Sequence, residues 1–161
     1  MDDDKKYMLE QYKIAIDTAN KTTDRRYNFN KFMIMICTAL IAAIGTLIPK
    51  CHFYTIPIAI LGIFICEAWI KQINCFKTMI KIKYNSVKKI EEENDYILKT
   101  YKNEYDERES AKNNENFKSL SEQEKHIAKI FKWGFIIYML IIFIPILFRI
   151  SPILFFINLL V

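Results

Sequence analysis

The stretch FMIMICTALIAAIGTLI, residues 32–48, decides the fold because none of its side chains is charged. About 17 such residues, wound as a helix, reach across the hydrocarbon core of a bilayer. Two further apolar runs follow at residues 53–70 and 133–149, and within them only Glu67 and Arg149 are charged. The sequence therefore predicts an all-α membrane protein with three transmembrane helices, at 32–48, 53–70 and 133–149.

The remaining sequence, residues 1–31 and 71–132, is polar but keeps helical periodicity. One face of the first segment carries Leu9, Tyr12, Ile16, Ala19 and Thr23 at spacings of three and four. A heptad-like seam follows in the second segment, with residues Ile80, Tyr84, Val87, Leu98, Tyr101 and Tyr105, and Asn94 at a core-like place. We expect an antiparallel cytoplasmic helical stalk built from residues 5–30, 72–105 and 121–132.

Breaks in the polar region are predicted from composition and capping signals. The stretch 106–118 is rich in Asn and charged residues and is expected to be a loop. Ser121 and Glu124 form a capping box that starts the helix leading into the third span. At the other end, Pro145 should kink this span, Arg149 should lie at the outer interface, and Ser151-Pro152 should turn the chain. Residues 150–161 then form a short apolar segment that is interfacial or re-entrant.

The charge distribution predicts the orientation. The chain has a net charge of +5, and its Lys and Arg residues gather before the first span and after the second. The positive-inside rule then places the N-terminus and the central region in the cytoplasm. Nucleic-acid binding is the alternative interpretation of a basic chain, and we consider it the weaker one.

Nothing in the sequence points to catalysis or to a cofactor. There is no Gly-rich phosphate loop, no HExxH and no GxSxG motif. The four cysteines, Cys37, Cys51, Cys66 and Cys75, lack metal-ligand spacing. We therefore expect a protein that is not an enzyme and that holds no metal and no cofactor.

Glu67 and Thr38 are the candidate polar residues within the spans. An acid inside a membrane helix faces a bundle interior or a water-filled path. Glu67 therefore either lines a pore or pairs with Arg25 or Arg26. The alternative is that it lies at the level of the lipid headgroups, because Lys71 follows only one turn later.

The Arg25-Arg26 pair allows two interpretations. Both residues could simply pin the inner boundary of the first span. They could also form an anion or nucleotide site together with lysines, whose candidate members are Lys21, Lys81 and Lys88.

Self-association is expected because one chain cannot cover all its packing faces. Ala39 and Ala43 form a small-xxx-small pair in the first span, and Gly62 marks a close-packing face of the second. In the stalk, Tyr84 and Leu98 occupy the seam. These five residues are the candidate oligomer contacts of a homo-oligomer.

The run LEQYKIAIDTANKTTDRRYNFNKFMIMICTALIAAIG, residues 9–45, resembles the start of the RipA-type octameric bacterial membrane proteins. The similar features are Glu10 to Lys13, Arg25-Arg26, Asn30, Phe32 and Thr38 to Leu40, followed by Trp69, Lys71, the Lys-rich residues 81–89 and Leu120 to Glu124. The resemblance extends to about Ile142. The longer central loop and residues 153–161 depart from the family pattern.

The resemblance implies a homo-oligomer in the bacterial inner membrane. Proteins of similar plan, the SLATT-type effectors, act in anti-phage systems, where a nucleotide made by a partner enzyme controls the membrane protein. The resemblance thus favours a channel or pore that is an anti-phage effector gated by a nucleotide or oligonucleotide at its cytoplasmic helices. The alternative is a non-conducting adaptor oligomer that docks soluble partners, with membrane lipid as the shared partner of both.

Overall fold

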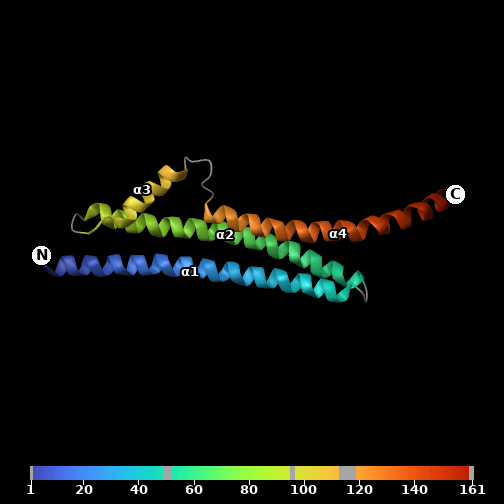
Figure 1. The fold of residues 1–161 in the computed structure, drawn as a ribbon, viewed down its shortest axis with the longest axis horizontal. Helices are drawn as coiled ribbons and strands as arrows, with labels where there is room; N and C mark the ends of the chain where they lie inside the picture. Colours follow the sequence, from blue (N-terminus) through green and yellow to red (C-terminus); the bar gives the residue numbers. More distant parts are fainter. Residues whose placement is uncertain (1, 49–51, 95–96, 113–118, 160–161) are drawn as a thin grey trace. The chain divides into compact units, whose positions relative to one another are not determined.

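A computed structural model describes residues 2–48, 52–94, 97–112 and 119–159, and Figure 1 shows its helices. In chain order these are α1 (Asp2–Leu47), the short 3₁₀ helix η1 (His52–Tyr54), α2 (Thr55–Glu93), α3 (Thr100–Lys112) and α4 (Leu120–Leu159). The chain divides into two compact units. We call Met1–Phe32 with Lys71–Lys125 the polar unit, and Met33–Ile70 with His126–Val161 the apolar unit.

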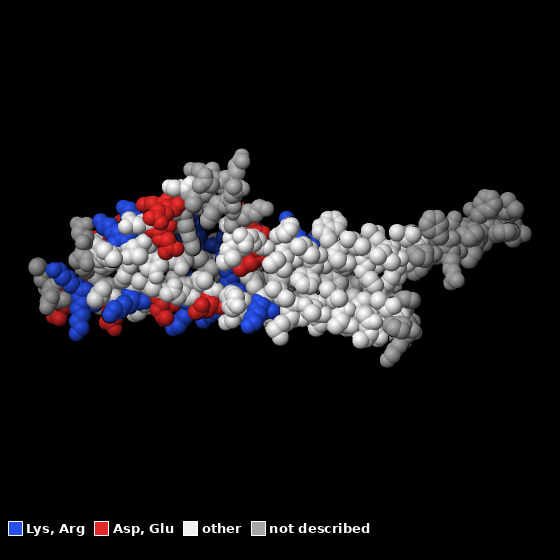
Figure 2. All heavy atoms as spheres, in the orientation of Figure 1, with Lys and Arg blue, Asp and Glu red and all other residues white. Residues whose placement is uncertain are grey.

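Three of the helices are long and apolar enough to cross a membrane, namely Asp3–Leu47, Thr55–Glu93 and Leu120–Ile144. Each combines a transmembrane stretch with polar sequence. Figure 2 shows that Lys, Arg, Asp and Glu gather on elements of the polar unit, whereas the apolar stretches are almost without them. The prediction of an all-α membrane protein with three transmembrane helices is confirmed, and the bounds of the spans stay predictions.

In the polar unit, α1 and α2 run antiparallel. The Tyr12 hydroxyl donates a hydrogen bond to Glu91, and further along α1 the ring of Phe29 lies 5.7 Å from that of Phe76. Later residues of α1 therefore contact earlier residues of α2, as in an antiparallel pair. The face of α1 that packs against the rest of the polar unit contains the buried residues Ala19, Thr22 and Arg26. This confirms the antiparallel helical stalk, although Leu9, expected on the inner face, is 44% exposed.

The helix that was expected to run to Tyr105 is interrupted. α2 ends at Glu93 and α3 begins at Thr100. At the end of α2, the side-chain amide of Asn94 donates a hydrogen bond to the Ile90 carbonyl at 2.8 Å. α3 continues to Lys112, so the expected loop is wrong for residues 106–112, while residues 113–118 lie outside the described part. The sequence of α3, TYKNEYDERESAK, contains no Gly or Pro and several good helix formers, which favours a helix over a loop.

The start of α4 is capped two residues earlier than the expected Ser121–Glu124 box. The Ser119 amide donates to the Glu122 carboxylate at 3.3 Å, and the Ser119 carbonyl accepts the Glu122 amide at 2.9 Å. Glu124 is unavailable for capping because it pairs with Arg26. The helix therefore starts as predicted, but with different residues at its N-terminus.

At its other end, α4 continues to Leu159, so the turn expected at Ser151-Pro152 is wrong. Proline is tolerated in membrane helices because neighbouring groups can satisfy the freed carbonyl. Residues 150–159 are helical, and their placement as interfacial or re-entrant stays a prediction. The side chains of Pro145 and Arg149, like residues 160–161, lie outside the described part, so their expected roles stay predictions too.

In the apolar unit, α2 and α4 also run antiparallel. The Tyr138 hydroxyl donates to the Thr55 hydroxyl at 2.7 Å, and the rings of Trp69 and Phe131 lie 6.2 Å apart. The buried apolar side chains described in this unit are those of Met33, Cys37, Ile44, Ala59, Cys66, Trp69, Ala128 and Phe135. Pro57 lies in the first turn of α2, as expected, where an amide hydrogen would have no partner.

Gly62 allows the closest contact between α2 and α4. A Cβ atom at this position would lie 2.7 Å from carbons of the Phe135 ring, which is itself only 2% exposed. Gly62, expected at a subunit contact, is therefore used inside the chain.

Replacing Gly62 by Leu is expected to destabilise the apolar unit by about 1–3 kcal/mol, because the added side chain overpacks against Phe135. The free energy of unfolding of the detergent-solubilised protein measures this. In the Gly62→Leu, Phe135→Ala double variant the cavity accepts the leucine, so the loss should be at least about 1 kcal/mol smaller than the sum of the single losses. Additive losses would mean that the two residues do not touch.

Candidate functional site

Glu67 and Lys132 form an ion pair in the apolar unit. Glu67 lies on α2 and Lys132 on α4, and the Lys132 ammonium donates to the Glu67 carboxylate. Next to the pair, Cys66 and Trp69 are fully buried. The acid in the second span thus pairs with neither Arg25 nor Arg26, and that part of the expectation is wrong.

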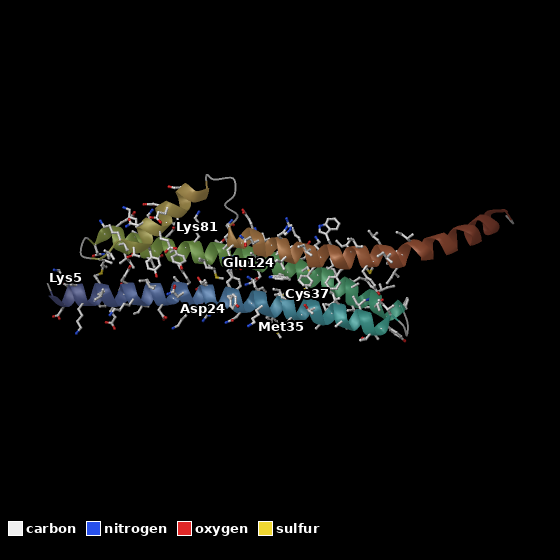
Figure 3. The ribbon with its side chains drawn as sticks, viewed as in Figure 1. Lys5, Asp24, Met35, Cys37, Lys81 and Glu124 are labelled. Carbon is white, nitrogen blue, oxygen red and sulfur yellow. The ribbon has the colours of Figure 1, made fainter. Side chains whose placement is uncertain are left out.

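The pair is only partly shielded. The Glu67 side chain is 42% exposed and that of Lys132 is 28% exposed. Two charges in apolar surroundings cost several kilocalories per mole each unless they are paired or hydrated, and these are both paired and open on one side. Thr38, the other candidate polar residue, is exposed on α1, while its neighbour Cys37, which Figure 3 labels, is buried.

The five cations proposed as an anion or nucleotide site do not form one cluster. Arg25 and Lys81 are exposed, and Lys21 forms a surface ion pair with Asp17 at 2.6 Å. Arg26 and Lys88 are each held by carboxylates of the same unit. Within the described residues, the arrangement leaves Arg25 and Lys81 as the members most open to a ligand.

Arg26 forms a buried ion pair with Glu124 in the polar unit. Its residue exposure is 8%, and its guanidinium donates twice to Glu124, from Nε at 2.9 Å and from Nη2. Thr22, one turn before it on α1, and Ser121, one turn before Glu124, are also buried. A guanidinium held this way joins α1 to the start of α4 and is not available to bind an anion.

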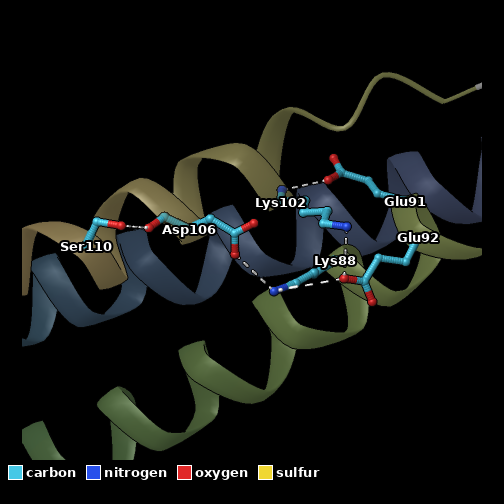
Figure 4. A network of polar contacts seen from close by, with 6 residues as sticks. All are labelled: Lys88, Glu91, Glu92, Lys102, Asp106 and Ser110. Carbon is cyan, nitrogen blue, oxygen red and sulfur yellow. Dashed lines mark hydrogen bonds and ion pairs between the residues drawn. The ribbon is translucent and has the colours of Figure 1, made fainter.

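Lys88 lies in a network on the outer side of α2 and α3, which Figure 4 shows from close by. Its ammonium contacts Asp106 at 3.3 Å and Glu92 at 3.9 Å, and it lies 4.6 Å from the ring centroid of Tyr105. Lys102 reaches Glu92 at 3.6 Å. These contacts are partly exposed to solvent, so each contributes little to stability, and together they orient α3 against α2.

Glu91 is the polar centre of this unit. It is fully buried on α2, and its carboxylate accepts the Tyr12 hydroxyl at 2.6 Å and the amides of Tyr101 at 3.1 Å and Lys102 at 2.8 Å. Both amides belong to the first turn of α3, where no helical carbonyl is available to them. The carboxylate therefore caps α3 and joins three helices through charge-assisted hydrogen bonds.

The environment of Glu91 also changes the acidity of the tyrosines around it. Burial, followed by the hydrogen bond to Glu91 and its negative charge, raises the pKa of Tyr12 well above its ordinary value. Burial and the neighbouring Tyr84 likewise raise the pKa of Tyr101. The Tyr12 hydroxyl thus stays protonated and remains a donor to the carboxylate.

The predicted oligomer contacts divide into two groups. Tyr84 stacks on Tyr101 with ring centroids 5.7 Å apart, and Gly62 meets Phe135, so both act inside the chain. Ala39 is exposed, Ala43 is partly buried, and Leu98 is 83% exposed. Ala39 and Leu98 are therefore the two residues of this set that are open to a neighbouring subunit.

Sequence reasoning missed Glu91 and Lys132, and it assigned Glu124 a capping role in place of its ion pair with Arg26. A signal for Glu91 was present, because it continues the spacing of Tyr84, Val87 and Asn94 along the seam. A charged residue at such a position requires a specific partner in the fold. For Lys132 no comparable signal exists, because a lysine at the end of an apolar run ordinarily extends to the headgroups.

Glu91→Gln is expected to destabilise the attachment of α3 by about 1–3 kcal/mol, because the amide group is neutral and turns a donor toward other donors. Amide hydrogen exchange at the start of α3 in the full-length protein should accelerate by about tenfold for every 1.4 kcal/mol. Glu92→Gln, the neighbouring exposed acid, is the matched control and should change exchange little. Equal effects of both variants would contradict the capping role.

The contribution of Tyr12 to stability should vanish at high pH. Its pKa is raised in the folded state, so the contribution is complete below the ordinary tyrosine pKa of about 10 and declines as the pH rises further. The difference in free energy of unfolding between the wild type and Tyr12→Phe should thus shrink from pH 8 to pH 11. A constant difference across this range would show that Tyr12 and Glu91 are not coupled.

No group of three or more His, Cys, Asp or Glu residues capable of holding a metal occurs in the described part of the chain. No curated protein and no solved structure matches the sequence. Residues 9–160 match the model of the octameric membrane protein family (8xMP). This match covers residues 9–31, the second polar segment and all three apolar stretches. It also extends past Ile142 through residues 153–160, so the expectation that this end departs from the family is wrong. The chain therefore belongs to the octameric membrane protein family and is a homo-oligomeric membrane protein.

Proposed function

We propose that the octamer is a gated channel in the bacterial inner membrane, with the N-terminus and the polar unit in the cytoplasm. The observation that carries this proposal is the partly exposed Glu67–Lys132 pair among apolar side chains. A charged pair that faced hydrocarbon would bear the full cost of desolvation. Facing a water-filled axis, the same pair is hydrated, and an octamer repeats it eight times around that axis.

Control of the channel is proposed to lie in the polar unit. α1, α2 and α4 pass without interruption from polar into apolar sequence, so a rearrangement of their polar segments can be transmitted along rigid helices. Exposed Arg25 and Lys81 offer positive charge to an anionic ligand. We propose a nucleotide or oligonucleotide made by a partner enzyme, and hence an anti-phage defence effector that is not itself an enzyme.

A second candidate function, a non-conducting adaptor, is supported by apolar side chains on the outside of the polar unit. The exposed fraction is 83% for Leu98, 60% for Ile82 and 62% for Tyr7. Surface positions of this kind are suited to docking a soluble partner or another subunit. This reading requires no ion pathway at all.

Ion flux through the purified octamer in sealed liposomes, with and without nucleotides or short oligonucleotides, tests the channel. Ligand-dependent flux is expected, and Glu67→Gln should change conductance or cation selectivity because the ring of carboxylates is lost. Glu92→Gln, a charge-matched change in the polar unit, should leave the conductance of the open channel unaltered.

Variants can also distinguish the effect of the Glu67–Lys132 ion pair from the effect of which charge lies at each position. The double exchange Glu67→Lys, Lys132→Glu retains an ion pair and should preserve the octamer while altering ion selectivity. Absence of flux under every condition, with the octamer intact, would overturn the channel and favour the adaptor. In that case Leu98→Asp should abolish partner binding.

A further inference from the structure

Two cysteines from different helices meet in the core of the apolar unit. Cys37 lies on α1 and Cys66 on α2, both are fully buried, and their Sγ atoms are 3.9 Å apart. Figure 3 labels Cys37 on the side of α1 that faces α2. Both thiols pack as small apolar groups in the core, but only two thiols in contact can also be oxidised to a bond with each other. The proposed channel makes no use of them.

The two sulfur atoms lie close to bonding distance. A disulfide needs its sulfur atoms about 2.05 Å apart, so the two must approach by about 1.9 Å. Rotation about the two Cα–Cβ bonds between staggered positions moves the sulfur atoms on this scale. The remaining described cysteine, Cys75, is exposed in the polar unit and makes no such contact.

We propose that Cys37 and Cys66 are a reversible redox site, oxidised by a peroxide to a disulfide that links α1 to α2 within each subunit. Hydrogen peroxide is small and uncharged, so it can reach thiols that charged oxidants cannot. In a reducing compartment such bonds are transient and signal oxidation rather than hold the fold together.

The chemistry is balanced in two steps. One thiol sulfur attacks a peroxide oxygen, the O–O bond breaks, and the thiol proton leaves with the departing hydroxide as water, giving a sulfenic acid. The second thiol sulfur then attacks the sulfenic sulfur, the S–O bond breaks, and a second water leaves. Two thiols and one peroxide thus yield one disulfide and two waters, and the two sulfur atoms supply the two electrons.

The test counts free thiols in the assembled octamer. In a Cys51→Ser, Cys75→Ser background, the protein is treated with hydrogen peroxide, quenched, unfolded in detergent and labelled with a polymer-bearing maleimide. Both remaining thiols should be lost together, with the chain still migrating as a monomer on a non-reducing gel. Dithiothreitol should restore both. Adding Cys66→Ser should leave Cys37 unable to form an intrachain bond.

The unsubstituted protein provides an independent measurement if the background variant fails to assemble. Its four thiols should fall to two, and mass spectrometry of the digested protein should find the peptides of Cys37 and Cys66 joined. Thiols that stay labelled, that are lost without recovery by dithiothreitol, or that join two chains would each overturn the proposal. None of these outcomes depends on whether the octamer conducts ions.

Discussion

Backbone hydrogen bonds that lipid cannot satisfy are the constraint on which this structure depends. An apolar stretch in a bilayer must be helical, because only an α-helix pairs its own amides and carbonyls within one segment. In this chain the helices do not end where the apolar sequence ends. α1, α2 and α4 extend into polar sequence, so the same helices that suit a membrane also build the polar unit.

Polar and charged groups are then accommodated by pairing within each unit. Buried Glu91 accepts three hydrogen bonds, and buried Arg26 meets Glu124 through two nitrogen atoms. In the apolar unit the single acid of the second span meets Lys132. The difference is exposure, since Glu91 is sealed off whereas Glu67 is open on one side. The buried groups stabilise the fold, whereas the partly exposed Glu67–Lys132 pair is the feature that supports the proposed aqueous pathway.

The sequence was sufficient to predict the helices because their signals are long. The three apolar runs and the periodicity of the first 30 residues each extend over several turns, so small local errors do not change the outcome. Expectations failed where a few residues and their contacts determine the local structure. The helix break at Asn94 is accompanied by a cap on α3 from Glu91, which lies on another helix. At the start of α4, Glu124 is held by Arg26, and Glu122 contacts Ser119 instead. Residues 106–112 are helical because they contain good helix formers and neither Gly nor Pro, a signal that their polar composition obscured.

In the candidate site, too, the sequence identifies single residues, but only the structure shows which residues they contact. Glu67 was identifiable as an acid in an apolar run, but its partner lies 65 positions away and on another helix. Gly62 was recognised as a close-packing residue, yet only the position of Phe135 shows that the contact is within the chain. Arg25 and Arg26 look equivalent in sequence, whereas helix geometry turns one outward and buries the other.

The measurement that tests the central claim most directly is a cryo-electron microscopy map of the octamer in a lipid nanodisc, read at position 67. The account predicts that the eight copies of Glu67, each with its Lys132, surround a central axis and contact water. If the pairs instead lie on the lipid-facing perimeter, or are sealed between subunits away from any axis, they cannot line an ion pathway, and the channel would be contradicted.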